Sequence, residues 1–246
     1  MIKTPLSEIR KRYIVRLVCR CIIFLAVLAL YLTGFEKHNI LAGFDFFRKP
    51  SVMHILWVIW LIDMLSQLIP IRKTIALGSY KIFRHRFKPA QGPFSQEALR
   101  KYIAETNRSA CRVMLVWIAL IAMLGVLKFS GILTDVHLFL VTVAFYVCDL
   151  ICVLIWCPFR LMMGNRCCTT CRIFNWDHLM MFTPMVYVKG FYSWSLLGLA
   201  IVIWIVWEGN VALHPERFWE KSNAALKCSE CTDKLCIQYC QKLRKK

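Results

Sequence analysis

Long apolar runs dominate this chain and limit the folds that are open to it. Six runs follow one another, at residues 13–34, 52–71, 113–127, 136–157, 173–188 and 191–207. A helix needs about 20 apolar residues to cross the hydrocarbon core of a bilayer, and most of these runs approach that length. The first run is too long for the apolar core of a signal peptide, so we expect a retained helix. The pattern predicts an all-α, polytopic membrane bundle of about six transmembrane helices.

The composition supports the same class. Hydrophobic residues make up 59% of the chain and charged residues only 19%. Soluble domains have about 45–50% apolar and about 25% charged residues. A chain of 246 residues cannot hide this much apolar surface in a soluble core, so the bilayer is the expected solvent.

The net charge of +18 is distributed unevenly between the segments that separate the apolar runs. With six crossings, 27 of the 32 Lys and Arg residues fall on the side of the amino terminus. The positive-inside rule then predicts that both termini are cytosolic, with the plasma membrane as the expected location. The same charge favours contact with anionic lipids, and no nucleic-acid-binding motif accompanies it.

The polar segments suggest how the chain is organised. Residues 1–172 form a four-helix region with a basic cytosolic loop at 72–112, and 173–246 form two further helices and a tail. A short surface helix is expected to begin at Ser95, and a cytosolic protein partner for the basic loop remains open. Run 173–188 contains Asp177, His178 and Pro184, so it is either a full span or a re-entrant arm.

Seven of the thirteen cysteines fall into two short polar clusters. The first, in residues 166–172, contains Cys167, Cys168 and Cys171, and the second, in the tail, contains Cys228, Cys231, Cys236 and Cys240. Each cluster includes a C-x-x-C pair, the spacing with which two thiolates bind one metal ion. The charge pattern places both clusters on the reducing cytosolic side, where metal ligation is favoured over disulfides.

These observations predict a metal site that joins loop 166–172 to the tail. The expected ligands are Cys168, Cys171, Cys228 and Cys231, with structural zinc favoured and Cys167, Cys236, Cys240 and His178 as alternates. An iron–sulfur cluster is the second interpretation, although neither common ferredoxin spacing is present. Thiol–disulfide exchange, lipidated cysteines or the absence of any site remain open.

Ionisable residues inside the apolar runs form a second group of candidates. Asp63, Asp149, Asp177 and His178 are candidates for an intramembrane polar or proton-carrying site. A carboxylate in hydrocarbon costs at least ~2.5–3.5 kcal/mol, so each needs a partner or a proton. Arg16 and Arg20 are the nearest basic residues by depth. An internal ion pair that fixes helix packing is an equal alternative.

Three hypotheses for the function follow. The first is a membrane protein whose cytosolic face is held together by the cysteine-ligated metal. The second is a membrane redox subunit with an iron–sulfur centre. The third is a transporter or channel that uses the intramembrane aspartates. No nucleophile elbow, P-loop or HExxH motif is present, so the sequence leaves open whether the chain is an enzyme.

Overall fold

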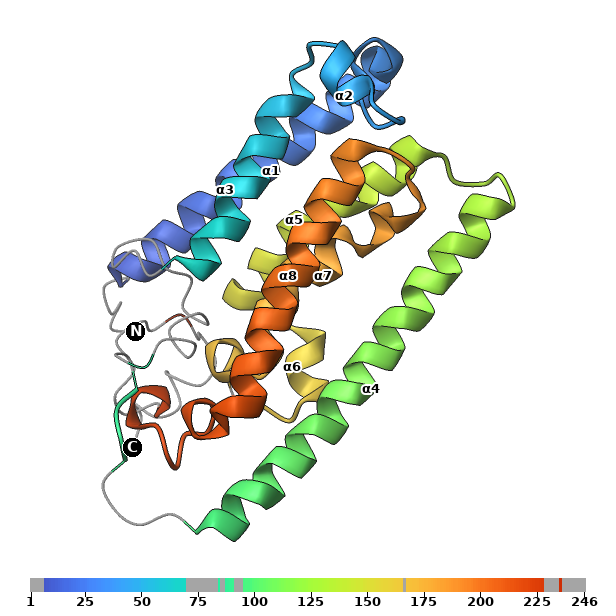
Figure 1. The fold of residues 1–246 in the computed structure, drawn as a ribbon. Helices are drawn as coiled ribbons and strands as arrows, with labels where there is room; N and C mark the ends of the chain where they lie inside the picture. The colour runs from blue at the N-terminus through green and yellow to red at the C-terminus, as the bar shows by residue number, and fades with distance from the viewer. Residues whose placement is uncertain are drawn as a thin grey trace.

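The computed structural model describes residues 7–69, 84, 87–90, 95–165, 167–227 and 235, and contains no β-strand among them (Figure 1). Four helices in these residues are long and apolar enough to cross a membrane: α1 (Glu8–Gly34), α4 (Gln96–Phe129), α5 (Asp135–Leu154) and α8 (Phe191–Leu213). A further apolar helix, α3 (Met53–Leu68), has 16 residues. Three short helices complete the set: α2 (Asp45–Arg48), α6 (Pro158–Met162) and α7 (Asp177–Phe182). The all-α class is thus confirmed, with four long apolar helices.

Polar caps mark where three of the long helices begin. The side chains of Ser7, Ser95 and Thr134 each accept a hydrogen bond from a backbone N–H in the first turn of α1, α4 and α5. These N–H groups have no partner within the helix, so a hydroxyl at this position stabilises the helix by about 1 kcal/mol. The predicted helix start at Ser95 is confirmed.

Helix α4 differs from the expectation of a short surface helix followed by a separate span. It is one helix of 34 residues. No Pro occurs in it, and its first Gly is Gly125, so nothing in the sequence interrupts the hydrogen bonding. Its first part packs on the start of the tail: the Tyr102 ring stacks on Trp219 at 5.4 Å between ring centres, and its hydroxyl donates to the Phe218 carbonyl.

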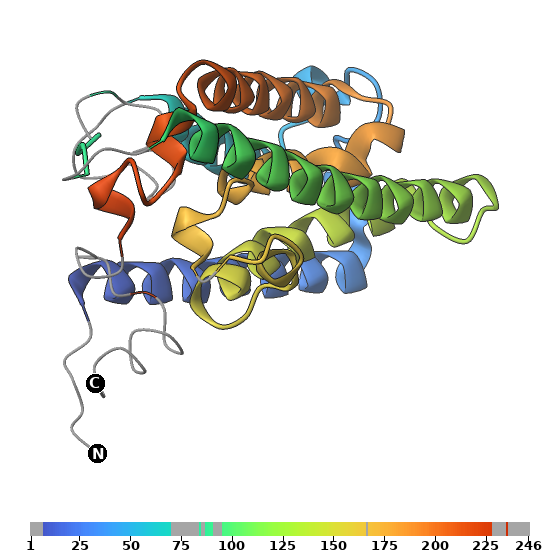
Figure 2. The same ribbon diagram turned by 90° about the horizontal axis from the view of Figure 1, so that it is seen from below.

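The helices lie in layers. Helix α1 packs against α5, α5 packs against α7, and both α7 and α3 pack against α8. Viewed from below, α1 lies on one side of the molecule, α4 and α8 on the other, and α5, α6 and α7 between them (Figure 2). This arrangement encloses α7. The helix belongs to run 173–188, which contains the ionisable residues Asp177 and His178.

Residues 173–188 do not form one regular helix. They consist of a 3-10 turn at Phe174–Trp176, helix α7, and a second 3-10 helix at Thr183–Tyr187 that has Pro184 near its start. At one end, the Arg172 carbonyl accepts a hydrogen bond from Trp207 of α8. At the other, Gly190 pairs with Gly43, in the connection between α1 and α3. The segment therefore leads from one end of the bundle to the other.

The core of the bundle surrounds Trp60 of α3, which is fully buried. Its ring contacts those of Phe182 at 5.1 Å, Tyr146 at 5.8 Å and Phe139 at 6.0 Å, all edge to face. Aromatic pairs in this geometry stabilise by about 0.5–1.5 kcal/mol each beyond their buried area. They connect α3, α5 and α7 at the middle of the molecule.

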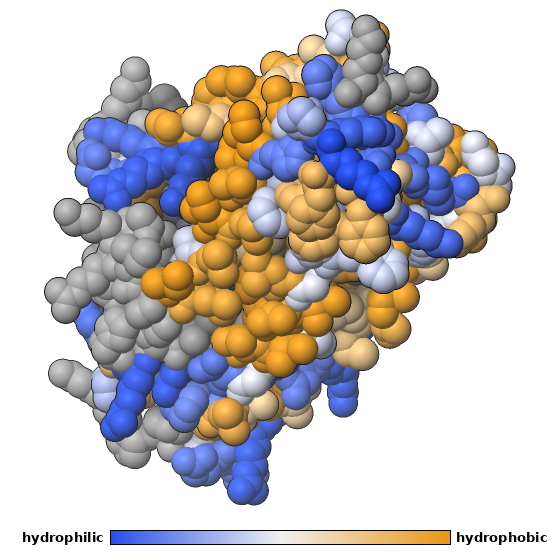
Figure 3. All heavy atoms as spheres, turned by 45° about the horizontal axis from the view of Figure 1, so that its top comes forward, coloured by the Kyte–Doolittle hydropathy of each residue, from blue (hydrophilic) through white to orange (hydrophobic). Residues whose placement is uncertain are grey.

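The outer surface of the long helices is apolar. Exposed hydrophobic residues recur along α1 (Val15, Val18, Ile22, Leu25) and along α4 (Leu115, Val116, Ile118, Met123). Figure 3 shows a broad orange area on one face of the molecule, with hydrophilic residues at its lower end and on both sides of its upper part. A surface of this kind is stable in lipid and not in water. The protein is therefore membrane-embedded, as the composition predicts.

The contact at Gly190 generates a test of the fold. A Cβ atom added there would lie 1.8 Å from the Leu41 carbonyl oxygen. We expect Gly190→Ala to separate the two connections and to lower the free energy of unfolding by about 1–3 kcal/mol, measured by thermal unfolding in detergent.

Gly198→Ala is the matched control, because an added Cβ on this residue of α8 meets nothing within 4 Å. It should leave the melting temperature unchanged or raise it. Equal destabilisation by both substitutions would contradict the packing of these two connections.

Candidate functional site: a buried charge cluster beside a thiol-lined cavity

Arg20 lies at the centre of a buried network of charged groups. It is buried on the inner face of α1 together with Tyr13 and Val27, seven residues before and after it. Its Nη1 donates to Asp149 Oδ2 of α5 at 2.6 Å, and its Nη2 donates to Asp63 Oδ2 of α3 at 2.9 Å. The planar guanidinium has several donors in a fixed geometry, so one side chain can bind carboxylates from two helices.

Tyr146 completes the environment of Arg20. Its carbonyl oxygen accepts a hydrogen bond from Nη1 at 2.7 Å, and the guanidinium lies 3.8 Å from the centre of its ring. The negative face of an aromatic ring attracts a cation, most strongly where water is absent. Arg20 of α1 is thereby held in one orientation by groups from two other helices, α3 and α5.

Asp177 and His178 of α7 extend the network. Gln67 Nε2, four residues after Asp63 on α3, donates to Asp177 Oδ2 at 3.0 Å and lies 2.8 Å from His178 Nδ1. His178 Nε2 lies 3.7 Å from Asp63 Oδ2, so the imidazole connects the two carboxylates. When Nδ1 accepts from Gln67, the ring hydrogen is on Nε2 and faces Asp63.

The cluster has more acidic than basic groups. Its three carboxylates face one permanent cation, Arg20, so the formal charge is −2 while His178 is neutral. A proton on His178 leaves −1, and Arg16, the next cation on α1, is exposed. An unpaired charge in a low-dielectric interior costs several kcal/mol. Two protons distributed over the carboxylates and the imidazole would make the cluster neutral.

The sequence singled out four of these residues, and the structure brings all four together. Asp63, Asp149, Asp177 and His178 come from α3, α5 and α7, and Arg20 is the basic partner suggested by depth. Their role in carrying protons stays a prediction. Gln67 was missed, although its spacing of four from Asp63 places both on one face of an apolar helix.

A polar contact at the end of α8 holds the loop that carries the first cysteine cluster. Arg172 pairs with Glu208 of α8 and with Asn107 of α4. The other Glu208 oxygen accepts a hydrogen bond from Trp176 Nε1 at 2.8 Å. The residues that follow the cluster are thus fixed between two long helices.

The predicted metal ligands can be placed only in part. Cys228, Cys231, Cys236 and Cys240 lie outside the described residues. Cys167 and Cys168 are half-buried, and Cys171 is buried in a hydrophobic cluster with Trp207 and Val211. Within the described part of the chain, no group of three or more His, Cys, Asp or Glu side chains is arranged to hold a metal ion. His178, an alternate ligand, is occupied by the charge cluster.

Cys168 instead lies beside the end of α5 and the turn that follows it. Its thiol donates to the Cys152 carbonyl oxygen at 3.2 Å. The Cys157 sulfur, at the start of α6, accepts a hydrogen bond from the Arg160 backbone N–H at 3.4 Å. Cys152, Cys157 and Cys168 all line one cavity, and together they are called the thiol cluster.

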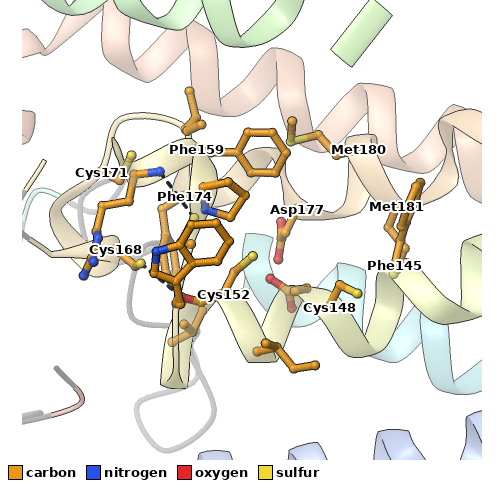
Figure 4. A pocket seen from close by; sticks show the side chains of 18 of the residues that line it. Phe145, Cys148, Cys152, Phe159, Cys168, Cys171, Phe174, Asp177, Met180 and Met181 are labelled. Atoms are coloured by element: carbon orange, nitrogen blue, oxygen red, sulfur yellow. Dashed lines mark hydrogen bonds between the residues drawn. The ribbon is translucent and has the colours of Figure 1, made fainter. Parts of the chain in front are cut away.

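A cavity of about 420 Å³ connects the two clusters. All three members of the thiol cluster line it, and so do the carboxylate-bearing residues Asp149 and Asp177. The remaining wall is largely apolar and aromatic. Figure 4 shows the labelled thiols, Asp177 and several aromatic rings around one space, which lies between α4, α5, α6 and α7. Apolar walls with a few convergent polar groups are typical of ligand sites.

Comparison with protein-family models, with curated proteins and with solved structures found no match.

Arg20 provides the test of the cluster. Arg20→Met removes the cation that Asp63 and Asp149 share, and losing one partner of a buried pair costs about 3–5 kcal/mol. We expect a correspondingly large fall in stability, measured by thermal unfolding in detergent. Arg16→Met, one turn earlier on the exposed face, should have little effect.

A triple variant, Arg20→Met with Asp63→Asn and Asp149→Asn, separates the effect of charge from that of shape. It removes the uncompensated charges together, so it should recover much of the lost stability. A triple variant no more stable than Arg20→Met would contradict the electrostatic interpretation.

Proposed function

We propose that this protein is a proton-linked membrane transporter, in which the buried charge cluster binds and releases protons as a ligand occupies the adjoining cavity. The observation that carries the proposal is the shared wall: Asp149 and Asp177 belong to the cluster and also line the cavity. A ligand that enters there changes the surroundings of two carboxylates directly.

The topology that we propose has six crossings, with both termini cytosolic. Four crossings are the long helices, the fifth is α3, and the sixth is the broken segment of residues 173–188. The course of that segment from Arg172 to Gly190 supports this count. The positive charge of the segments on the amino-terminal side supports the orientation and suggests contact with anionic lipids.

The charge imbalance supplies the capacity for protons. Three aspartates, one histidine and one arginine are neutral together only when two protons are bound. Binding free energies at neighbouring sites are reciprocally coupled, so a ligand that prefers one protonation state also shifts proton binding. Intramembrane carboxylates with His partners are typical of proton pathways in transporters.

Infrared difference spectroscopy tests the proton content. A protonated carboxyl group absorbs separately from a carboxylate, and we expect a protonated signal at neutral pH that disappears as the pH rises. The signal should be lost in the double variant Asp149→Asn with Asp177→Asn.

Asp45→Asn serves as the control, because Asp45 pairs with Lys49 at the end of the bundle, away from the cluster. Its spectrum should match that of the wild type. If the wild-type protein shows no protonated carboxyl group at any pH at which it remains folded, the cluster is a fixed ionic clamp and the proposal fails.

A metal-stapled cytosolic face is the second candidate function, and Leu235 is the observation that favours it. This tail residue is buried against Tyr13 of α1 and Leu150 and Leu154 of α5. Leu235 therefore lies at the end of α5, next to the loop that carries Cys168. A metal held between that loop and the tail would fit the paired C-x-x-C spacing.

Elemental analysis of the purified protein tests this candidate. We expect about one zinc ion per chain, lost in a Cys228→Ser/Cys231→Ser variant and retained in Cys19→Ser, which changes an exposed thiol of α1. Stoichiometric iron with visible absorbance would indicate the redox alternative. Wild-type protein without zinc or iron would exclude the metal site.

A further inference from the structure

The charged residues in the cavity wall indicate what kind of ligand the cavity takes. Among its described lining residues, these are Asp149, Asp177 and Arg160. The side chains of Asp149 and Asp177 keep 21% and 16% of their surface exposed, and Figure 4 shows the Asp177 carboxylate within the space that the labelled residues surround. Arg160 of α6 is buried. The charge that the wall presents to a ligand is therefore mainly negative.

The groups that hold these two carboxylates carry too little positive charge to neutralise them. Arg20 binds Asp149 through Oδ2 alone and shares its single charge with Asp63. Asp177 accepts from Gln67, whose amide is uncharged. The buried cluster is neutral only with two positive charges beyond that of Arg20. Protons can supply them, and so can a cation in the cavity, because it would lie beside the same carboxylates.

The rest of the wall favours an aromatic group on such a cation. Trp117, Phe145 and Phe159 line the cavity, and Trp117 lies 5.2 Å from Phe145 and 5.9 Å from Phe159 between ring centres. Aromatic ring faces attract cations, most strongly where water is absent. Five cysteines and two methionines also line it, the thiol cluster among them. Sulfur is polarisable and packs favourably against aromatic rings.

The cavity reaches the outer surface of the bundle beside α5. Cys148 of α5 and Trp156, two residues beyond its end, both line the cavity and are both exposed. Because α5 is one of the helices that are long and apolar enough to cross a membrane, this opening faces lipid. A ligand that enters through it needs an apolar part as well as its charge.

We infer that the cavity binds an amphipathic organic cation with an aromatic ring, held by Asp149 and Asp177. The inference rests on the proposed transport function and names the class of ligand that is transported. In that function the bound cation takes the place of a proton. A monovalent cation should then release about one proton on binding, and its affinity should rise with pH as protons leave the carboxylates.

Three small molecules of similar shape and different charge test the inference. The full-length protein in nonionic detergent is dialysed to equilibrium with radiolabelled trimethylphenylammonium, whose charge does not depend on pH. The competitors are tert-butylbenzene, its neutral isostere, and benzenesulfonate, an anion of similar size. We expect one saturable site for the cation, with an affinity about tenfold or more above that of either competitor.

Variants of the wall identify the groups that bind. Asp149→Asn/Asp177→Asn should weaken binding of the cation by about tenfold or more and leave binding of tert-butylbenzene nearly unchanged, which a collapsed cavity would not do. Phe159→Leu should weaken binding of the cation by about threefold to tenfold. Asp45→Asn and Phe129→Leu are the matched controls, because neither residue belongs to the described cavity wall. Both should bind like the wild type.

Two results would overturn the inference: tighter binding of benzenesulfonate than of the cation, which would assign the cavity to Arg160, or equal binding of the cation and tert-butylbenzene. Both comparisons use the wild-type protein, so they decide the matter even if a variant does not fold. A pH indicator in weak buffer tests the transport function separately. Cation binding without proton release would refute proton-linked transport and leave the class of ligand assigned.

Discussion

The pairing of Arg20 with Asp63 and Asp149 determines how the membrane helices assemble. Lipid offers no hydrophobic driving force between apolar helices, so polar contacts and close packing decide which faces meet. A lone arginine in α1, or a lone aspartate in α3 or α5, would be costly at this depth. Once paired, they hold three helices together, and the position of Arg20 between Tyr13 and Val27 fixes which face of α1 points inward.

The same need for polar partners explains why the broken segment of residues 173–188 lies inside the bundle. Irregular backbone at membrane depth is tolerated only where protein surrounds it. Helix α7 lies between α5 and α8, and the two ends of the broken segment are held by Arg172 with Glu208 and by Gly190 with Gly43. The enclosure allows the short helix to present Asp177 and His178 to Gln67 and Asp63. A regular, lipid-facing span could not carry these two residues without partners.

The sequence predicts the helices of this protein better than the contacts between segments that lie far apart in the chain. Apolar length predicts the long helices, and insertion cost predicts that Asp63, Asp149, Asp177 and His178 have partners. The thiol cluster could not be predicted, because Cys152 and Cys157 look like small apolar residues at the end of a run, and only the turn after α5 brings Cys168 back to them. Likewise, the packing of the first part of α4 on the start of the tail joins Tyr102 and Trp219, which lie far apart in the chain.

The two clusters meet at one cavity, and this shared position links their chemistry. Asp149 and Asp177, two of the acidic groups that need protons to be neutral, line it together with the three thiols. In a nearly apolar space the charge of either cluster is poorly screened, so a change of charge at one cluster alters the electrostatic potential at the other. A proton or a ligand that changes the charge of Asp149 or Asp177 therefore also changes the electrostatic surroundings of the thiols.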